Sequence, residues 1–257
     1  MTDLPLRLAE LSSHRLRALY AAPGRTAVLW PLGSTEPHGP HLPLATDTLL
    51  AEHNALAAAR RLRQAGVTAL VAPPLPYGVT DYADGFTGAI SIPAPALVAI
   101  IEAAAARHLH DGADHVCLVN HHLEPAHQDA ITAAAARLAA AHGPHRISAP
   151  RVVSRRWGAR LGDEFRSGAC HAGRYEGSLV LAAAPALVDR DAAAALPALD
   201  ISLAPHKTAD RPGFRALGMT DAYTGDPAAA TASEGEALYA ILTEMVATTV
   251  LEALETS

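Results

Sequence analysis

The chain has 257 residues, and 50% of them are hydrophobic, which suffices for one large domain or two small ones with a sizeable core. Its formal net charge of −6, with 14 histidines counted as neutral, argues against a general nucleic-acid-binding protein, which normally carries a basic face. The chain has only two cysteines, and its N-terminal stretch lacks the apolar core of a signal peptide. No apolar run approaches the ~20 residues that span a bilayer. We therefore expect a cytoplasmic protein without a membrane partner.

The first part of the chain alternates short apolar runs with amphipathic stretches. Residues 26–31 form an apolar, β-branched run that predicts a buried strand, and a loop rich in Gly and Pro follows over 32–46. Asp47 opens a helical pattern that stops at Gly66, and a second strand is expected over 67–72. This order is typical of a strand–helix–strand unit.

The same alternation continues after a long loop, with Pro125 well placed near a helix start. Segment 185–227 carries Gly, Pro and Asp turns without a clear period, and predicts loops and irregular edge elements. The remaining expected elements are helices over 94–110, 125–142, 174–184 and 234–253, and strands over 115–119 and 146–154.

Strands that alternate with helices predict an α/β fold with a mainly parallel sheet that is covered on both faces. No stretch is rich enough in Pro, Gly or Ser to act as a linker between separate units. We therefore expect a single domain over residues 1–257.

Polar clusters follow the predicted strands, where open α/β sheets bind their ligands. Each cluster mixes imidazole with carboxylate, and these nitrogen and oxygen ligands suit Zn²⁺ or Mn²⁺ better than a metal that prefers thiolates. A bridging carboxylate such as Asp47 could hold two ions, which lie ~3.5–4 Å apart in two-metal hydrolases. The residues concerned are Glu36, His38, His41 and Asp47 after the first strand, Asn120, His121, His122 and Glu124 after the third, and Cys170, His171 and Glu176 further on.

Three of these segments resemble motifs of the creatininase (creatinine amidohydrolase) family. The most specific is Gly33-Ser-Thr-Glu36-Pro-His38-Gly-Pro-His41-Leu-Pro-Leu-Ala-Thr-Asp47, although the family usually has Gln where Pro37 stands. Asn120-x-His122-x-Glu124 resembles the family's Asn-Gly-His-Tyr-Glu, and His171-Ala-Gly-Arg-Tyr-Glu176-Gly-Ser resembles His-Ala/Gly-Gly-x-x-Glu-Thr-Ser. The resemblance implies a three-layer α/β/α sandwich, a binuclear metal site and a homo-oligomer, usually a hexamer.

The resemblance also implies a role for each matching residue. Glu36 and His38 would each hold a different metal ion and Asp47 would bridge the two, with Zn²⁺ and/or Mn²⁺ as the ions and Fe²⁺ as an alternative. His122 would complete the first site, and either Glu124 or Glu176 would complete the second. A metal-bridged hydroxide would attack the substrate, and His171, Glu124 or Glu176 would protonate the leaving nitrogen.

This chemistry predicts an amidohydrolase that cleaves a C–N bond of a small cyclic amide or amide-like metabolite. The alternatives within the family are a peptidase that trims a short modified peptide, as in mycofactocin maturation, and a deformylase. Two departures leave the substrate open: Asp81, Tyr82 and Asp84 stand where many relatives carry a Glu-His pair, and His121 replaces a glycine. A catalytically silent relative that binds a ligand or serves as a structural subunit is the hypothesis from a different class.

Several residues also have an ordinary structural interpretation. Asp47 could cap the helix that it precedes, and Glu124 and Glu176 could be first-turn carboxylates favoured by the helix dipole. For His41, a loop hydrogen bond to the backbone is favoured over metal ligation. His121 is expected at the surface or in the pocket wall.

Catalytic or ligand-binding roles are also considered for the two cysteines, one serine and a group of arginines. Cys117 is expected to be inert core, and Cys170 is disfavoured as a nucleophile because neighbours in an extended chain point apart. Ser34 lacks the Gly-x-Ser-x-Gly context of a serine hydrolase. Arginines suit the capture of carboxylate or phosphate, but a solvated face or a subunit contact is the commoner outcome for a group such as Arg151, Arg155, Arg156 and Arg160.

Overall fold

The computed structural model describes residues 4–204 and 212–256. The strands are β1 (Arg25–Leu32), β2 (Val67–Val71), β3 (His115–Asn120) and β4 (Ile147–Ser148). The α-helices are α1 (Ser13–Ala21), α2 (Thr46–Gln64), α3 (Ala94–Asp111), α4 (Pro125–His142), α5 (Arg155–Gly158), α6 (Gly162–Ser167), α7 (Arg174–Ala183), α8 (Arg190–Ala195) and α9 (Ala232–Glu255). Short 3-10 helices lie at Leu8–Glu10, Asp81–Ala83, Pro144–Arg146, Pro185–Leu187 and Pro227–Ala229.

The strands form one parallel sheet in the order β2-β1-β3-β4. Leu29 of β1 lies beside Val71 of β2 on one side and Cys117 of β3 on the other. The chain therefore changes direction across the sheet at β1, and the crevice beyond the ends of β1 and β3 is the place where such sheets bind ligands.

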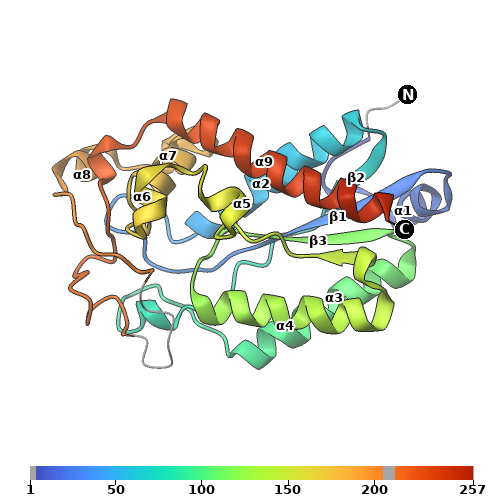
Figure 1. The fold of residues 1–257 in the computed structure, drawn as a ribbon, viewed down its shortest axis with the longest axis horizontal. Coiled ribbons are helices and arrows are strands. Elements are labelled where there is room, and N and C mark those ends of the chain that lie inside the picture. Colours follow the sequence, from blue (N-terminus) through green and yellow to red (C-terminus); the bar gives the residue numbers. More distant parts are fainter. Residues whose placement is uncertain (1–3, 205–211, 257) are drawn as a thin grey trace.

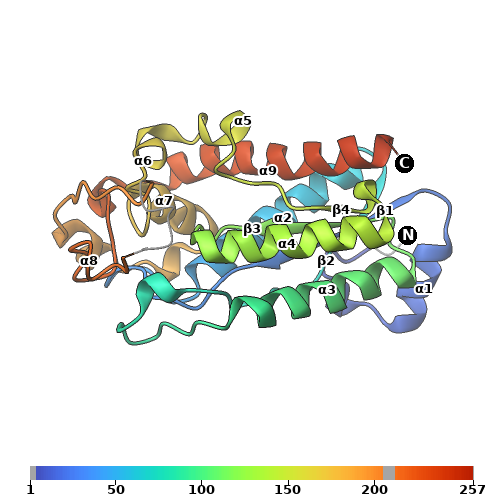
Figure 2. The ribbon, with the colours of Figure 1, turned by 60° about the horizontal axis from the view of Figure 1, so that its bottom comes forward.

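Side chains of the central strands alternate between two cores. Leu29 and Cys117 belong to the core beneath α2, α7 and α9, whereas Val28 and Val116 belong to the core beneath α3 and α4. Figures 1 and 2 show these helices on opposite faces of the sheet. Because both faces are covered, the strands read as continuous apolar runs, and the predicted three-layer α/β/α fold is confirmed.

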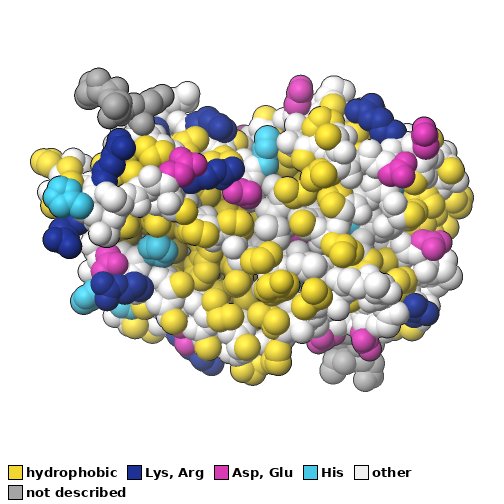
Figure 3. Space-filling view, turned by 180° about the vertical axis from the view of Figure 1, so that it is seen from behind, with side chains coloured by type: hydrophobic (Ala, Val, Ile, Leu, Met, Phe, Trp, Pro, Cys, Tyr) yellow, Lys and Arg dark blue, Asp and Glu magenta, His cyan; other side chains and the backbone are white. Residues whose placement is uncertain are grey.

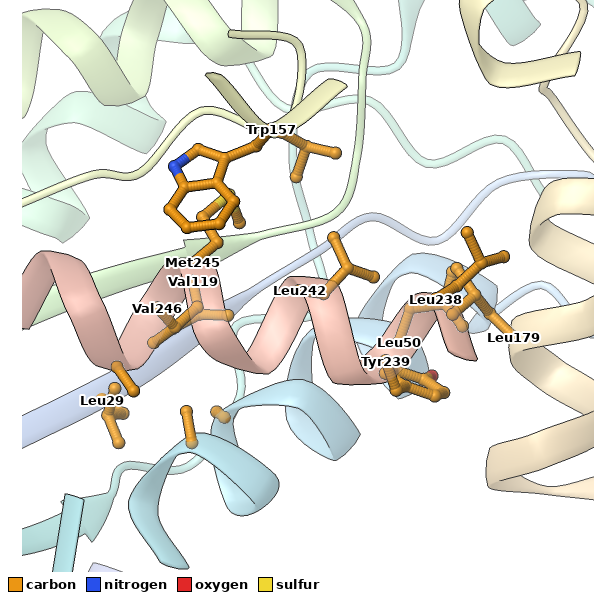
Figure 4. Close-up of a cluster of buried hydrophobic side chains, with 14 of the residues drawn as sticks. Leu29, Leu50, Val119, Trp157, Leu179, Leu238, Tyr239, Leu242, Met245 and Val246 are labelled. Carbon is orange, nitrogen blue, oxygen red and sulfur yellow. The ribbon is translucent and has the colours of Figure 1, made fainter. Parts of the chain in front are cut away.

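Helix α9 supplies much of the first core. Leu242 and Val246 are fully buried and lie close to Leu29 and Val119 of the sheet and to Leu50 of α2 (Figure 4). Each such side chain contributes about 1.5–3 kcal/mol through removal of its apolar surface from water. Among the described residues, α9 is also the one helix long and apolar enough to cross a membrane, and 44% of its apolar stretch is buried within the protein.

Most expected elements are confirmed, but the strand expected over 146–154 is wrong beyond Ser148. β4 pairs with β3 only at Ile147 and Ser148, and Pro150 then removes a backbone donor at this sheet edge. The chain turns instead, with the Ser154 amide donating to the Arg151 carbonyl at 3.0 Å. This turn brings the arginine-rich segment over the ends of the strands.

Four helices were not predicted. Helices α5, α6 and α8 have only 4, 6 and 6 residues, too few for a period to show, and α1 buries none of its residues. Helix α8 falls in the segment expected to be irregular, and its start is capped by Asp189, which accepts a hydrogen bond from the Ala192 amide at 2.9 Å. Apart from two short 3-10 helices, the other described residues of 185–227 form turns and irregular backbone, as predicted, and 205–211 lie outside the described residues.

Candidate metal centre

The seven residues predicted to bind metal or transfer protons all lie at the carboxyl end of the sheet, and all are buried. They come from the loop between β1 and α2, the turn after β3, the segment before α7, and the first turns of α2 and α7. They are Glu36, His38, Asp47, His122, Glu124, His171 and Glu176. Segments that are far apart in the sequence thus meet because parallel strands end at the same edge.

Asp47 lies at the centre of the cluster. Its Oδ1 is 3.6 Å from His38 Nε2, and its Oδ2 is 3.1 Å from His122 Nδ1. The hydroxyl of Ser34 donates to Oδ2 at 2.7 Å and fixes the carboxylate. The helix-cap interpretation is wrong for Asp47, because Ala45 occupies the cap position of α2 and Asp47 lies within the first turn.

Three histidines are oriented in the same way. One ring nitrogen of each lies near a backbone carbonyl: His38 Nδ1 is 3.1 Å from the Glu36 oxygen, His122 Nε2 is 2.7 Å from the Val79 oxygen, and His171 Nε2 is 3.0 Å from the Pro37 oxygen. A carbonyl can only accept, so that nitrogen carries the proton. The other nitrogen of each ring faces the carboxylates, as in histidines that bind metals.

The Nε2 atom of His38 is buried and has no hydrogen-bond partner among residues 4–204 and 212–256. It lies 3.4 Å from Glu176 Oε2 and 3.9 Å from Glu36 Oε1. Buried polar atoms are normally satisfied, so this atom fits a cation that would sit between it and the carboxylates. Three sets of ligand atoms lie within 4.8 Å of one another: Glu36, Asp47 and His122; His38, Asp47 and Glu176; and Glu36, His38 and His171.

The charges of the cluster also fit a bound cation. Burial raises the pKa of Glu176 to about 8, against the opposing effect of His38. Burial opposes the charged form of His38, but Asp47 and Glu176 outweigh it and raise the pKa of His38 to about 10. For His171, burial and the nearby positive charge of His38 lower the pKa to about 4. Without metal, histidine protons therefore balance the carboxylates, and His171 remains neutral.

The two glutamates that the sequence left undecided differ in their surroundings. Glu176 accepts the Ala172 amide at 2.6 Å and shares a ligand set with His38 and Asp47. Glu124 instead accepts the amides of Asp81 and Tyr82, both at 3.1 Å, and belongs to no ligand set among the described residues. Burial raises the pKa of Glu124 to about 7.

Supporting residues were missed in the sequence. The Thr80 hydroxyl donates to Glu36 Oε2 from 44 positions away. His127 accepts the Val79 amide at 3.3 Å through Nδ1 and lies 3.1 Å from Asn120 Oδ1 through Nε2, so it steadies the carbonyl that orients His122. Ala172, beside His171, has a left-handed φ of 54°, a conformation that an alanine adopts only under constraint. No sequence motif around these residues indicates their roles.

Two other histidines lie outside the ligand sets. His41 is buried beside the Ala172 backbone, which opposes the fall in its pKa, although neither ring nitrogen makes a well-aligned hydrogen bond among the described residues. His121 is neither at the surface nor in the cavity wall: its Nε2 lies 3.1 Å from the side-chain amide of Asn54, inside the protein. Burial lowers the pKa of both to about 4.

The cysteines behave as the sequence predicts. Cys117 is buried in β3, and burial raises its pKa to about 12. Cys170 lines the cavity beside His171, but burial raises the pKa of this thiol as well. A thiol that holds its proton is a poor nucleophile.

A cavity of about 480 Å³ opens above the cluster, a size typical of small-molecule sites. Buried Glu36, Asp47 and Glu176 form its floor. Aromatic walls come partly from the segment without a clear period: Phe214 lies with its ring centre 4.4 Å from that of His171. Sequence patterns did not predict this contribution.

Comparison with known proteins gives consistent matches. The family model described as Creatininase, creatinine amidohydrolase, matches residues 9–250. Over 220 residues, the chain is 36% identical to a mycofactocin precursor peptide peptidase of Mycobacterium ulcerans (strain Agy99), covering 83% of this chain and 80% of that protein. A protein of the same name from Mycolicibacterium smegmatis is 49% identical over 74 residues, which are 27% of this chain and 29% of that protein.

Solved structures share the fold. A structure described as "Creatininase Mn" matches with a TM-score of 0.74 at 22% identity, covering 97% of this chain and 98% of the other. A creatinine amidohydrolase (creatininase) structure matches with a TM-score of 0.74 at 21% identity and the same coverage, 97% and 98%. Because the family match extends over nearly the whole chain, this protein belongs to the creatininase (creatinine amidohydrolase) family of hydrolases.

Proposed function

We propose that this protein is a binuclear metal-dependent hydrolase that cleaves a C–N bond in a short modified peptide. The observation that carries the proposal is the buried cluster in which Asp47 belongs to two ligand sets at once. Glu36, Asp47 and His122 would hold one ion, and His38, Asp47 and Glu176 the other. Zn²⁺ and Mn²⁺ suit this set of nitrogen and oxygen donors, with Fe²⁺ as an alternative.

When bound, such ions lower the pKa of a coordinated water to ~7 and polarise the substrate carbonyl. The chain's own residues supply the proton transfers. Nδ1 of His171 faces the cluster, while its Nε2 is held by the Pro37 carbonyl, so Nδ1 can accept a proton and return it to the leaving nitrogen. Phe214 and Tyr82 line the cavity and exclude water from this exchange.

The comparisons favour a peptide over the small cyclic amide that the motifs suggested first. The curated relatives named above are peptidases of a precursor peptide, and one of them matches over 83% of this chain. A cavity of about 480 Å³ also offers more room than a single small ring such as creatinine requires. A cyclic amide, a formamide or a silent relative remain as outcomes of the test.

The test combines metal content with turnover. Elemental analysis of purified protein should give two equivalents of metal, and Asp47→Ala should lose most of it, whereas the surface control Asp111→Ala should keep both. Turnover should be found with short peptides in a panel that also holds creatinine, hydantoin and formamides. Unchanged metal content in Asp47→Ala would remove the binuclear site, and turnover confined to cyclic amides would remove the peptide.

We further propose that residues 1–257 form one domain, that the protein acts in the cytoplasm, and that it self-associates. The two cores share one sheet, which supports a single cooperative unit. Leu44, Tyr77 and Ile90 are each more than 40% exposed, at 43%, 43% and 46%, and Figure 3 shows a broad area of hydrophobic side chains on one face. Such areas are typical of subunit contacts. Light scattering should give a mass above that of the monomer, and six chains would match the family's usual hexamer.

A further inference from the structure

Arginines stand at the mouth of the cavity whose floor is the metal cluster. Arg151, Arg155 and Arg166 line it, and all three are exposed, whereas the carboxylates of the floor are buried. One exposed carboxylate, Asp129, lines the cavity as well, and Arg166 is paired with Asp163. Arginines nevertheless outnumber carboxylates at the mouth, in a chain whose formal net charge is −6. The charged side chains are therefore not mixed evenly around the cavity, because arginines gather at its mouth and carboxylates at its floor.

The arginines of this segment fall into two groups. Arg156 is 3.1 Å from Glu252, Arg160 is 2.8 Å from Glu244, and both guanidinium groups lie over the Trp157 ring. These two pair with α9, as expected for a solvated face. Arg151 and Arg155, by contrast, have no carboxylate within ion-pair distance anywhere in residues 4–204 and 212–256.

The two unpaired arginines are held by a packed turn. Between them, Val152 is buried, and Trp157 is buried just beyond. The amides of Trp157 and Gly158 donate to the Ser154 carbonyl at 3.1 and 2.8 Å. This anchoring reduces the freedom that the turn's backbone would lose when its side chains bind a ligand.

We propose that Arg151 and Arg155 form a subsite that binds a carboxylate of the substrate. Guanidinium groups bind carboxylates through paired, charge-assisted hydrogen bonds. A carboxylate held at the mouth would leave the neighbouring amide directed towards the floor. The substrate is therefore an amide that carries a carboxylate, supplied either by the free C-terminus of a peptide or by an acidic side chain. The inference rests on the proposed function, because it assumes that the scissile bond lies at the metal cluster.

Four small probes test the subsite and its source. Gly-Phe with a free carboxylate is compared with Gly-Phe amide, and Gly-Glu amide is compared with Gly-Gln amide. Calorimetry measures their binding to the purified protein loaded with Zn²⁺, and turnover is measured separately. We expect a carboxylate form to bind roughly 10- to 100-fold more tightly than its neutral partner, as a charge-assisted contact implies. This preference should weaken with added salt, because the arginines are exposed.

The variants Arg151→Ala and Arg155→Ala should each reduce the carboxylate preference by about tenfold and leave the neutral probes unchanged. Arg156→Ala is the matched control, because it removes an adjacent charge that is paired with Glu252. Thermal melting checks that each variant folds. Arg155→Lys should keep part of the preference, since it retains the charge without the planar fork.

The outcomes separate this inference from the proposed function. A preference that disappears in Arg151→Ala or Arg155→Ala but persists in Arg156→Ala supports the subsite, even if no probe is turned over. Peptide turnover without any carboxylate preference overturns the subsite and leaves the proposed function intact. An equal loss in Arg156→Ala also overturns it, because the effect would then reflect overall charge.

Discussion

The two ends of the central sheet use the same residue types in opposite ways. At the amino end, Asp114 Oδ2 accepts both the Thr26 amide, at 2.8 Å, and the Thr26 hydroxyl, at 3.0 Å. His115 lies 2.7 Å from the His145 carbonyl through Nδ1 and 2.7 Å from the Ser148 hydroxyl through Nε2. At the carboxyl end, a buried ring nitrogen of His38 lies close to carboxylates and has no hydrogen-bond partner in the part of the chain that the structure describes.

This difference separates residues that stabilise the fold from residues that, under the proposed function, would bind a metal ion. A buried polar group left without a partner costs about 1–3 kcal/mol, and crowded buried carboxylates cost more. At the amino end these groups have partners, so they stabilise the protein by themselves. At the carboxyl end, histidine protons balance the carboxylates in the metal-free protein, and under the proposed function a bound cation would take over that role. Substitutions at the two ends should therefore change different properties.

The largest effect is expected for Glu176→Gln. We predict loss of about one of two metal equivalents and a fall in turnover of about 10⁴-fold, because a missing ion removes several kcal/mol of charge stabilisation. Metal analysis and steady-state kinetics measure both. The matched variant Glu124→Gln should keep both ions, since Glu124 is held by the amides of Asp81 and Tyr82. The reverse result would show that Glu124 completes the second site.

The next effect is expected for His171→Ala. Loss of a group that moves a proton should reduce turnover by about 10³-fold, while both metal ions stay bound. Kinetics and elemental analysis on the same preparation separate the two properties. Loss of metal together with turnover would instead make His171 a ligand, as its presence in one ligand set allows. Normal turnover would remove its role altogether.

The amino end should respond through stability. Burial lowers the pKa of His115 to about 4, from 6.5 in an unfolded chain. As the pH falls below 6.5, His115 becomes protonated in the unfolded chain but stays neutral in the folded protein. The free energy of unfolding therefore decreases until about pH 4. The contribution is about 3 kcal/mol at most.

Urea denaturation of metal-free protein at pH 7, 5.5 and 4.5 measures this contribution. Several buried histidines titrate in the same range, so the informative quantity is the difference between wild type and His115→Gln. That variant should lose less stability on acidification, and its turnover at pH 7 should equal that of the wild type. Equal pH dependence in both proteins would mean that folded His115 takes up a proton as readily as the unfolded chain does.

The sequence predicted what depends on short-range pattern. Continuous apolar runs located β1, β2 and β3, and the spacing of Glu36, His38 and Asp47 indicated a metal site, because strand ends place such residues together. The expected strand over 146–154 failed after Ser148, where an edge strand gains little from pairing and a proline intervenes. Propensity alone cannot weigh these tertiary contributions.

Contacts between residues that are far apart in the sequence could not be predicted. Thr80 binds Glu36, and Phe214 covers His171, without any local pattern that marks them. The choice between Glu124 and Glu176 depended on which carboxylate a neighbouring loop engages, and the sequence does not show this. His121 was misplaced because a polar residue beside a binding motif suggests a pocket, whereas its side chain contacts Asn54 of α2 inside the protein.

The smallest effect is expected at His121. This residue lies at the carboxyl end of the sheet, yet its contacts resemble those of the amino end, so it tests the comparison between the two ends. Asn54 donates to His121 Nε2 and accepts from the Thr243 hydroxyl at 3.4 Å, so His121 has partners although it lies next to His122. His121→Ala should therefore reduce the free energy of unfolding by about 1–3 kcal/mol, with metal content and the choice of substrate unchanged. Denaturation, elemental analysis and the probe panel measure these. A changed substrate preference at normal stability would place His121 with the residues that serve the ligand and not with those that hold the fold.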